Sequence, residues 1–514
     1  MSDALPASWS AAGAILLVSC YELGRQPLNL ASPAGQLQDA GFGVRARDTS
    51  LDPVTSEELQ AAALIAISVP MHTALRLGIE LAKRIRREAP QAHICFYGLY
   101  ASLNAKYLVG RDYADTVTGG EVEVALVHLA RQLAKLQRTP SERIRLTASE
   151  TVQGVSWHID QLTSGTSIAP PVLRKLPFVV PSREQLPPLD RYAHLIGPEP
   201  DQTRTAAYVE ASRGCLHQCR HCPISPVYQG RFFIVPHDIV MADAEQQIAR
   251  GAKHITFGDP DFFNGPKHGM RLLEELHAAH PELSFDVTIK VEHLLRYQTQ
   301  FARLPELGCL FVISAIESLS DKVLARLDKG HTRRDITTLL DRCRAIGLGL
   351  RPTLVAFTPW TSLDDYITLI DWLLDEQLCD SVDPIQLGIR LLVPPGSLLT
   401  QEPSAPNWLG PLDEDSLGHR WNHPDPRVDE LFDSVSSYLS DHAGGDALQM
   451  VIAIRQLAYA AAGRTPTRDF DSRSYVRSWS PRMSESWFCC AEPNAAQFAA
   501  AQSSNCCPVP SVNG

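Results

Sequence analysis

Short apolar runs alternate with amphipathic stretches in two separate parts of this chain, and that alternation limits the fold more strongly than any other feature. In the first part, the apolar runs include 14–18, 63–68 and 92–97, and a helical pattern at 74–87 separates the last two. Strands that alternate with helices favour an open parallel sheet with helices on both faces. Ligands of such sheets lie beyond the carboxyl ends of the strands. We therefore expect an α/β domain with a doubly wound sheet over residues 1–135.

The same alternation resumes after a proline-rich segment at 136–204, which we expect to be an extended linker. Six βα units then follow within about 190 residues, which predicts a partial or complete parallel barrel over 205–400 with its chemistry at the carboxyl ends of the strands. Beyond the barrel we expect a small, mainly helical region at 401–480 and a flexible, cysteine-rich tail at 481–514. The expected barrel strands are 206–210, 254–257, 284–289, 310–315, 349–356 and 385–392.

Charge and cysteine content exclude several classes of protein. The chain has 47 Lys and Arg against 58 Asp and Glu, a net charge of −11, so we expect no nucleic-acid partner. The apolar runs are too short to cross a bilayer, and the first residues lack the positive flank of a secretory signal. Twelve cysteines in 514 residues are too few for a disulfide-stapled secreted scaffold. We therefore expect a cytoplasmic protein with reduced cysteines and no membrane contact.

The strongest local signal is the motif Cys215-x3-Cys219-x2-Cys222, directly after the first expected barrel strand. Three thiolates on one short loop can hold three corners of a [4Fe-4S] cluster and leave the fourth iron open. An open iron can chelate S-adenosylmethionine (SAM) and deliver an electron to its sulfonium, which releases a 5′-deoxyadenosyl radical. The alternative is a zinc site completed by His217 or His221, but no second Cys-x2-Cys pair stands at ordinary spacing.

This motif resembles the signature of the radical SAM superfamily, and the resemblance extends over residues 205–400. It implies a partial (β/α)6 TIM-like barrel in which the three cysteines bind the cluster. His221 departs from the usual pattern, because the superfamily places an aromatic ring before the third cysteine. The alternative for Asp259 and Glu317 is an ordinary role in turns or helix caps. The resemblance implies that SAM is held by residues at later strand ends, namely Gly258, Asp259, Glu317, Ser318 and Arg351.

The first domain resembles the Rossmann-like, B12-binding domain of the cobalamin-dependent branch of this superfamily. Small residues at its turns would let a flat corrin approach the backbone. The Asp-x-His-x-x-Gly motif that supplies a cobalt ligand in other B12 proteins is absent, and His72 is only a remote candidate. The alternative is a purely structural domain. The resemblance implies cobalamin contacts at Gly98, Tyr100, Ser102, Gly120 and Glu121.

A methylthiotransferase has the same broad architecture and is a competing interpretation. That family needs three further cysteines in its first domain for a second cluster, whereas this region has only Cys20 and Cys95. Neither is paired in sequence, and both stand at strand ends, so we expect buried structural thiols.

Two vicinal cysteine pairs mark the tail, Cys489-Cys490 and Cys506-Cys507. Adjacent thiols can form a strained disulfide, bind a soft metal or metalloid, or relay electrons. The sequence from Cys489 to Pro493 reads Cys-Cys-Ala-Glu-Pro and resembles the defining motif of the CUAEP/CCAEP-tail radical SAM (seleno)protein family. We predict that Cys489 and Cys490 form a mobile catalytic thiol pair.

Together these features predict a radical SAM enzyme, cobalamin-dependent, that methylates or rearranges a small molecule or a peptide and takes electrons from a cytosolic donor. One alternative is a radical SAM enzyme without cobalamin, whose first domain is structural. Another is an iron–sulfur or metalloid-binding protein without turnover. We expect His254, His268 and His293 to have structural or surface roles.

Overall fold

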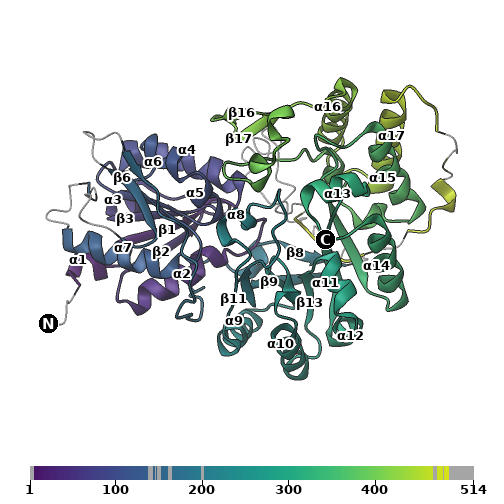
Figure 1. The fold of residues 1–514 in the computed structure, drawn as a ribbon. Coiled ribbons are helices and arrows are strands. Elements are labelled where there is room, and N and C mark those ends of the chain that lie inside the picture. The colour runs from purple at the N-terminus through teal and green to yellow at the C-terminus, as the bar shows by residue number, and fades with distance from the viewer. Residues whose placement is uncertain are drawn as a thin grey trace, which may run out of the picture.

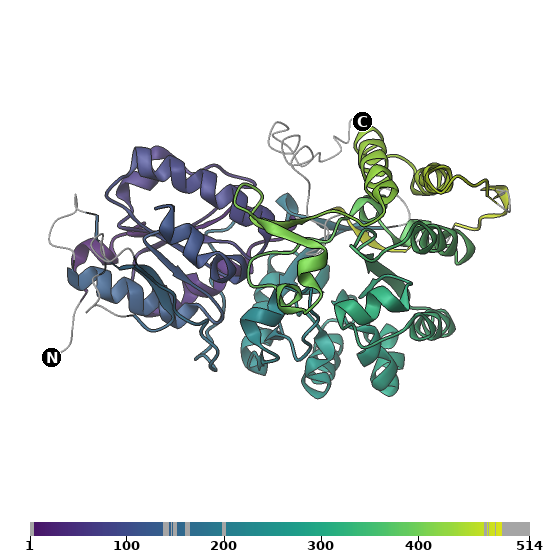
Figure 2. The same ribbon diagram turned by 45° about the horizontal axis from the view of Figure 1, so that its top comes forward.

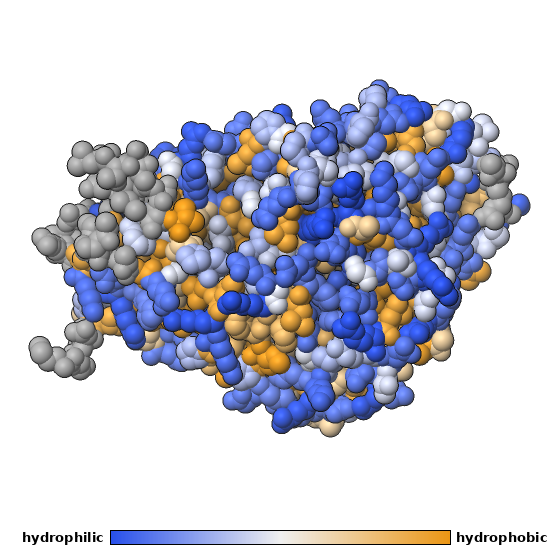
Figure 3. Space-filling view, in the orientation of Figure 1, coloured by the Kyte–Doolittle hydropathy of each residue, from blue (hydrophilic) through white to orange (hydrophobic). Residues whose placement is uncertain are grey.

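The computed structural model contains two α/β units side by side, each built on its own mainly parallel sheet (Figure 1). On the face drawn in Figure 3, apolar side chains are scattered in small groups among polar ones. Within the part of the chain that the structure describes, no helix is both long and apolar enough to cross a membrane. The structure describes residues 5–136, 143–144, 146, 152–159, 165–197, 202–466, 470, 472–477 and 480–485.

The first sheet has the strand order β2-β1-β3-β4-β5-β6-β7, in which β1 to β5 are parallel and β6 and β7 are antiparallel. Every residue of β1, β3 and β4 is buried, as expected for apolar strands covered on both faces. The order 2-1-3-4-5 places the topological switch point between β1 and β3. The strands are β1 (Ile15–Ser19), β2 (Val44–Asp48), β3 (Leu64–Ser68), β4 (His93–Tyr97), β5 (Thr116–Thr118), β6 (Val155–Ile159) and β7 (Gly165–Ser167).

Helices cover both faces of this sheet and form two separate cores, so the predicted doubly wound architecture is confirmed. α1, α2 and α7 pack on one face, and α3 to α6 pack on the other. The helices are α1 (Ala7–Ser10), α2 (Leu28–Asp39), α3 (Ser56–Ala61), α4 (His72–Glu88), α5 (Leu99–Leu103), α6 (Ala105–Gly110) and α7 (Glu123–Leu136).

The segment 136–204 differs from the extended linker that its prolines predict. β6 and β7 extend the first sheet, and the segment also contains a 3-10 turn, η1 (Leu189–Arg191), and strand β8 (His194–Ile196). β8 pairs antiparallel with the first barrel strand. A proline cannot donate a backbone hydrogen bond to a neighbouring strand, but short strands can still form between prolines. The high proline content of this segment therefore did not exclude strands.

The second sheet is an open half-barrel with the order β15-β14-β13-β12-β9-β8-β18. Its five parallel strands confirm five of the six predicted barrel strands. At the edge opposite β15, β18 pairs antiparallel with β8. The strands are β9 (Thr203–Val209), β12 (His254–Phe257), β13 (Ser284–Thr288), β14 (Cys309–Glu317), β15 (Gly349–Leu354) and β18 (Arg482–Met483).

The sixth predicted strand, 385–392, is wrong. Residues Pro384–Gly388 form a 3-10 helix, and only one isolated parallel bridge joins Phe357 to Arg390. The backbone N–H of Leu354 donates to the side-chain Oε1 of Gln386 at 2.9 Å. A side chain therefore satisfies a group that a neighbouring strand would otherwise pair.

Helices on the outer face of the half-barrel share one core with α16 and α17. They are α9 (His237–Ala249), α10 (Pro266–Ala279), α11 (Val291–Arg296), α12 (Gln298–Arg303), α13 (Asp321–Leu327), α14 (Arg333–Ala345) and α15 (Leu363–Asp375), with the 3-10 turns η2 (Phe262–Asn264), η3 (Pro305–Leu307), η4 (Cys379–Ser381) and η5 (Pro384–Gly388).

The region after the barrel contains two long helices and a short hairpin that leans toward the first domain (Figure 2). His72 Nε2 lies 2.7 Å from the carbonyl oxygen of Ser416 in the hairpin turn, so the hairpin contacts α4. These elements are η6 (Leu398–Gln401), η7 (Ala405–Asn407), β16 (Leu409–Asp413), β17 (Gly418–Trp421), α16 (Pro426–Asp441), α17 (Ala447–Ala461) and η8 (Ser472–Ser474).

Candidate functional site

The three-cysteine loop lies directly beyond the carboxyl end of β9, between β10 (Ser212–Gly214) and α8 (Ile224–Tyr228). β10 pairs antiparallel with β11 (Phe232–Ile234), which fixes the base of the loop. Gly214 has a φ of +74°, and a Cβ there would overlap the Tyr228 ring and the Arg231 carbonyl oxygen. Glycine is therefore required immediately before the first cysteine.

The three predicted ligands all stand on this loop. Cys215 and Cys219 are buried and Cys222 is half-buried. The N–H of Cys222 donates to the Cys219 carbonyl at 3.1 Å. Burial, with a smaller effect from the nearby Asp261 carboxylate, raises the pKa of the Cys215 thiol to about 11. Since thiolates are the metal-binding form, binding at this loop must release protons.

Asp259 holds the loop in place. Its carboxylate accepts from the Ala211 N–H at 2.9 Å and from Ser212 Oγ at 2.5 Å, so both oxygens bind the segment that leads into the cysteines. Burial raises the pKa of Asp259 to about 7, against the effect of these hydrogen bonds. The neighbouring Gly258 lies against Tyr208, whose ring would overlap any Cβ at this position.

Glu317 lies at the carboxyl end of β14, where a register irregularity gives it a φ of +65°. Its Oε1 accepts from Lys329 Nζ at 3.1 Å and lies 3.2 Å from His221 Nε2. Burial alone would raise the pKa of Glu317, but Lys329 and His221 outweigh it and lower the pKa to about 2. The buried Oε2 has no hydrogen-bond partner among the described residues. Ser318 is adjacent, and its Oγ accepts from the Ser320 N–H.

Arg213 links the cysteine loop to the first domain. Its guanidinium lies 2.5 Å from Glu123, 3.0 Å from Glu210 and 3.5 Å from Glu121. Tyr228 Oη also donates to Glu121 at 3.0 Å. Burial raises the pKa of Glu121 to about 7, although Arg213 opposes this.

The five residues predicted to contact cobalamin cluster at the carboxyl edge of the first sheet, but they differ in accessibility. Gly98, Ser102 and Gly120 are half-buried, so a ligand can approach them. Tyr100 packs in the core, and Glu121 is engaged as described above. A Cβ at Gly120 would overlap the Val172 backbone, so packing within the chain also explains this glycine.

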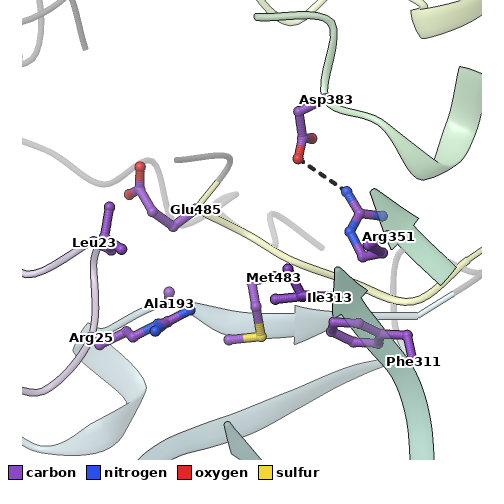
Figure 4. A pocket seen from close by; sticks show the side chains of 9 residues that line it. All are labelled: Leu23, Arg25, Ala193, Phe311, Ile313, Arg351, Asp383, Met483 and Glu485. Atoms are coloured by element: carbon purple, nitrogen blue, oxygen red, sulfur yellow. Dashed lines mark hydrogen bonds and ion pairs between the residues drawn. The ribbon is translucent and has the colours of Figure 1, made fainter. Parts of the chain in front are cut away.

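Arg351 does not join the Glu317 group but lines a separate pocket where the two domains and the C-terminal segment meet (Figure 4). It pairs with Asp383 at 3.0 Å, and its buried Nη1 has no partner among the described residues. Leu23 and Arg25 belong to the loop after β1, at the switch point of the first sheet. The lining residues are Leu23, Arg25, Ala193, Phe311, Ile313, Arg351, Asp383, Met483 and Glu485.

Sequence reasoning missed Lys329, Asp383 and Glu485. Lys329 follows the predicted Glu317 segment in a Leu-Asp-Lys-Gly stretch, so its proximity to a strand end was the available signal. Asp383 and Glu485 carried no local signal, because only the folded chain brings them to Arg351. Cys489, Cys490, Cys506 and Cys507 lie outside the described residues.

Comparison with known proteins defines the class. Residues 209–370 match the profile of the radical SAM superfamily, and this segment contains the three-cysteine loop and strands β12 to β15. The chain is therefore an enzyme with a radical SAM domain. Domains of this class work with a [4Fe-4S] cluster and SAM.

The curated proteins that match this chain share only about a quarter of the aligned residues with it. The ribosomal protein uS12 methylthiotransferase RimO of Chloroherpeton thalassium is 24% identical over 182 residues, 33% of this chain and 41% of that protein. RimO of Ectopseudomonas mendocina is 25% identical over 231 residues, 40% of this chain and 52% of that protein. The chain thus spans about half or less of the length of these curated relatives.

Two solved structures share the fold across both domains. One is the cobalamin-dependent SAM radical enzyme OxsB with aqua-cobalamin bound, with a TM-score of 0.63, 17% identity, and coverage of 84% of this chain and 67% of that chain. The other is the radical SAM methyltransferase TsrM from Kitasatospora setae with cobalamin and a [4Fe-4S] cluster bound, with a TM-score of 0.55, 19% identity, and 70% coverage of each chain. At these identities the likeness is one of fold.

Proposed function

We propose that this chain is a cobalamin-dependent radical SAM enzyme that methylates or rearranges a small molecule or a peptide, using a [4Fe-4S] cluster bound by Cys215, Cys219 and Cys222. The observation that carries the proposal is the three-thiol loop at the carboxyl end of the first barrel strand. The donor set fits a cluster, since three cysteines stand on one loop and leave a fourth position open. When bound, the cluster supplies the electron that cleaves SAM to a 5′-deoxyadenosyl radical.

The two imidazoles of the loop support the cluster over the zinc alternative. His221 Nε2 faces Glu317 at 3.2 Å, and His217 Nε2 faces Asp261 at 3.2 Å. The Nε2 of each ring is therefore turned toward a carboxylate, so a tetrahedral zinc site would have to take its fourth ligand from the remaining Nδ1 of one ring.

Glu317 is the best-supported residue for holding SAM. Its Oε2 is an open acceptor, its carboxylate stays ionised at neutral pH, and Lys329 and His221 fix its position. An ammonium or a ribose hydroxyl of SAM would satisfy this oxygen. We assign Ser318 to the same subsite. Asp259 orients the cysteine loop through Ala211 and Ser212, so we assign it a positioning role.

For cobalamin, the supporting features are the strand order of the first sheet and the half-buried Gly98, Ser102 and Gly120 at its carboxyl edge. Tyr100 and Glu121 would contribute through packing and through the Arg213 network. The methylthiotransferase alternative needs cysteines in the first domain that can bind a second cluster. Cys20 and Cys95 do not suit this role, because both are buried and burial raises the pKa of each thiol to about 12.

We assign the tail thiols Cys489 and Cys490 to a step after SAM cleavage. Glu485 lines the Arg351 pocket, and Cys489 follows it by four residues. A four-residue extended chain reaches about 14 Å, so the thiol pair can act near this pocket. A cytosolic electron donor would serve the cluster.

The experiment incubates the anaerobically reconstituted protein with SAM and dithionite and measures 5′-deoxyadenosine. We expect its formation, and corrin absorbance after reconstitution with cobalamin. An intact cluster that yields no 5′-deoxyadenosine would favour a binding protein without turnover. Cleavage without bound corrin would favour the cobalamin-independent enzyme.

A second measurement tests the tail. Cys490→Ser should retain cluster assembly and SAM cleavage but lose product formation. Loss of SAM cleavage as well would contradict a late role for this thiol.

A further inference from the structure

Three metal-ligating side chains meet beside the cysteine loop without belonging to the cysteine set. His217 lies on the loop itself, Asp261 follows β12, and His293 lies in α11 after β13. One ligand atom from each, His217 Nε2, Asp261 Oδ2 and His293 Nδ1, lies within 4.8 Å of the other two. Asp261 Oδ2 is 3.2 Å from His217 Nε2 and 2.8 Å from His293 Nδ1.

These separations are short enough for ion pairs between a protonated imidazole and the carboxylate, but they do not have the angles of hydrogen bonds. All three atoms are buried, and none of them has a hydrogen-bond partner among the described residues. A ring N–H pointing straight at an oxygen 2.8 Å away would form an ordinary hydrogen bond, so neither ring nitrogen points its N–H along the line to Asp261 Oδ2. An ion about 2.1 Å from both atoms would hold N and O about 3.0 Å apart at a 90° bond angle and about 3.4 Å apart at a tetrahedral angle. The 3.2 Å separation to His217 falls within this range, and the 2.8 Å separation to His293 corresponds to bonds of about 2.0 Å at about 90°.

The surroundings also match those of a metal site. The other oxygen of Asp261, Oδ1, accepts from the Phe263 N–H at 3.1 Å, which fixes the carboxylate. The other nitrogen of His217, Nδ1, lies 3.8 Å from Glu292 Oε2. Metal-bound histidines commonly turn their second nitrogen toward a carboxylate, and metal-bound carboxylates are themselves hydrogen-bonded. The His217 side chain is 15% exposed, which leaves an entry path for an ion.

We propose that His217, Asp261 and His293 form a second metal site, separate from the cysteine loop's own, for a borderline divalent ion such as Zn²⁺. Two imidazoles and one carboxylate are the donor set of catalytic zinc and of non-haem iron sites, and they leave positions open for a further ligand. The ion satisfies three buried polar atoms that lack hydrogen bonds. The site requires only these side chains, so it does not depend on the substrate or on cobalamin.

The test uses the full chain with its iron–sulfur cluster assembled anaerobically. The protein is equilibrated with Zn²⁺, freed of unbound metal by gel filtration, and analysed for zinc and iron by mass spectrometry. We expect one zinc per chain in addition to the cluster iron. His293→Ala should raise the dissociation constant for zinc at least about a hundredfold, and Glu292→Gln about tenfold, with no change in iron. The matched control is His280→Ala, which removes a partly exposed histidine paired with Glu245.

A second arm separates the two metal sites. The triple variant Cys215→Ser, Cys219→Ser and Cys222→Ser is titrated with Co²⁺, whose spectrum reveals whether thiolates bind it. We expect retained Co²⁺ binding without thiolate charge-transfer bands. If His293→Ala does not fold by circular dichroism, His217→Ala replaces it, because the His217 side chain is less deeply buried than that of His293. Absence of zinc in the wild-type chain would overturn the proposal, as would metal that disappears with the cysteines and survives His293→Ala.

Discussion

Arg213→Met should weaken the coupling between the two domains, because this side chain joins the cysteine loop to carboxylates of the first domain. The guanidinium contacts Glu121, Glu123 and Glu210, and its side chain is only 17% exposed. Removing one partner of a buried ion pair costs about 3–5 kcal/mol, because the remaining charge stays buried without compensation. Methionine keeps much of the side-chain volume, so this cost is mainly electrostatic. We expect a loss of about that size in the free energy of unfolding at pH 8.

The loss should depend on pH in a defined direction. Without Arg213, burial raises the pKa of the three carboxyl groups in the folded chain, above their values in the unfolded chain. The folded variant then binds more protons than the unfolded one, so its stability falls as the pH rises through the raised pKa values. Each additional carboxyl group protonated in the variant changes stability by about 1.4 kcal/mol per pH unit. The difference from wild type should therefore be smaller at pH 6 than at pH 8.

The assay is anaerobic thermal unfolding of both proteins at pH 6, 7 and 8, followed by circular dichroism. Arg303→Met is the control, because Arg303 and Glu274 are both about half-exposed and such a pair contributes about 1 kcal/mol or less. A destabilisation that is the same at pH 6 and pH 8, or no larger than that of the control, would refute the electrostatic explanation.

Three further predictions concern the site itself. Cys219→Ala should lower the iron bound after reconstitution by roughly tenfold, whereas Cys379→Ala, a buried thiol away from the loop, should leave it unchanged. Gly258→Ala should lower the free energy of unfolding by about 1–3 kcal/mol, seen as a lower Tm, because the new Cβ would displace the Tyr208 ring. Glu317→Gln should be less stable than the wild type at neutral pH, where the ionised Glu317 stabilises the fold. The wild type loses this stabilisation as the pH falls from 4.5 toward about 2, so the Tm values of the two proteins should converge in acid. A constant Tm difference across that range would contradict this.

The periodic parts of the chain predicted most of the architecture. Strands such as Leu64–Ser68 and His93–Tyr97 are mainly apolar runs between helical patterns, and the structure has them where the sequence places them. The sixth barrel strand failed because residues 385–392 also read as a short apolar run. Pro384 and the Gln386 side chain directed that run into a 3-10 helix instead. Local periodicity cannot anticipate a side chain that replaces a strand.

The candidate site was predictable only where its residues stand close together in sequence. The cysteines share one loop, so their spacing alone indicated their chemistry. His217, Asp261 and His293 are 44 and 32 residues apart, and each in isolation is an unremarkable polar residue. Parallel strands bring their carboxyl ends to one edge of the sheet, and this edge is where the three residues meet. The sequence-based expectation of a structural or surface role for His293 took no account of its burial beside Asp261.

Asp259 and Glu317 show why one residue type at one kind of position supports two different roles. Both carboxylates follow a barrel strand, both are buried, and the sequence offered an ordinary turn role for either. Each oxygen of Asp259 accepts a hydrogen bond, one from the Ala211 N–H and the other from the Ser212 hydroxyl. No cation is bonded to this carboxylate among the described residues, and burial raises its pKa to about 7. Glu317 is held on one oxygen by Lys329, stays charged, and leaves the other oxygen open. A carboxylate with an open, ionised oxygen is well placed to bind a ligand, whereas one whose oxygens hold a backbone N–H and a hydroxyl positions its neighbours.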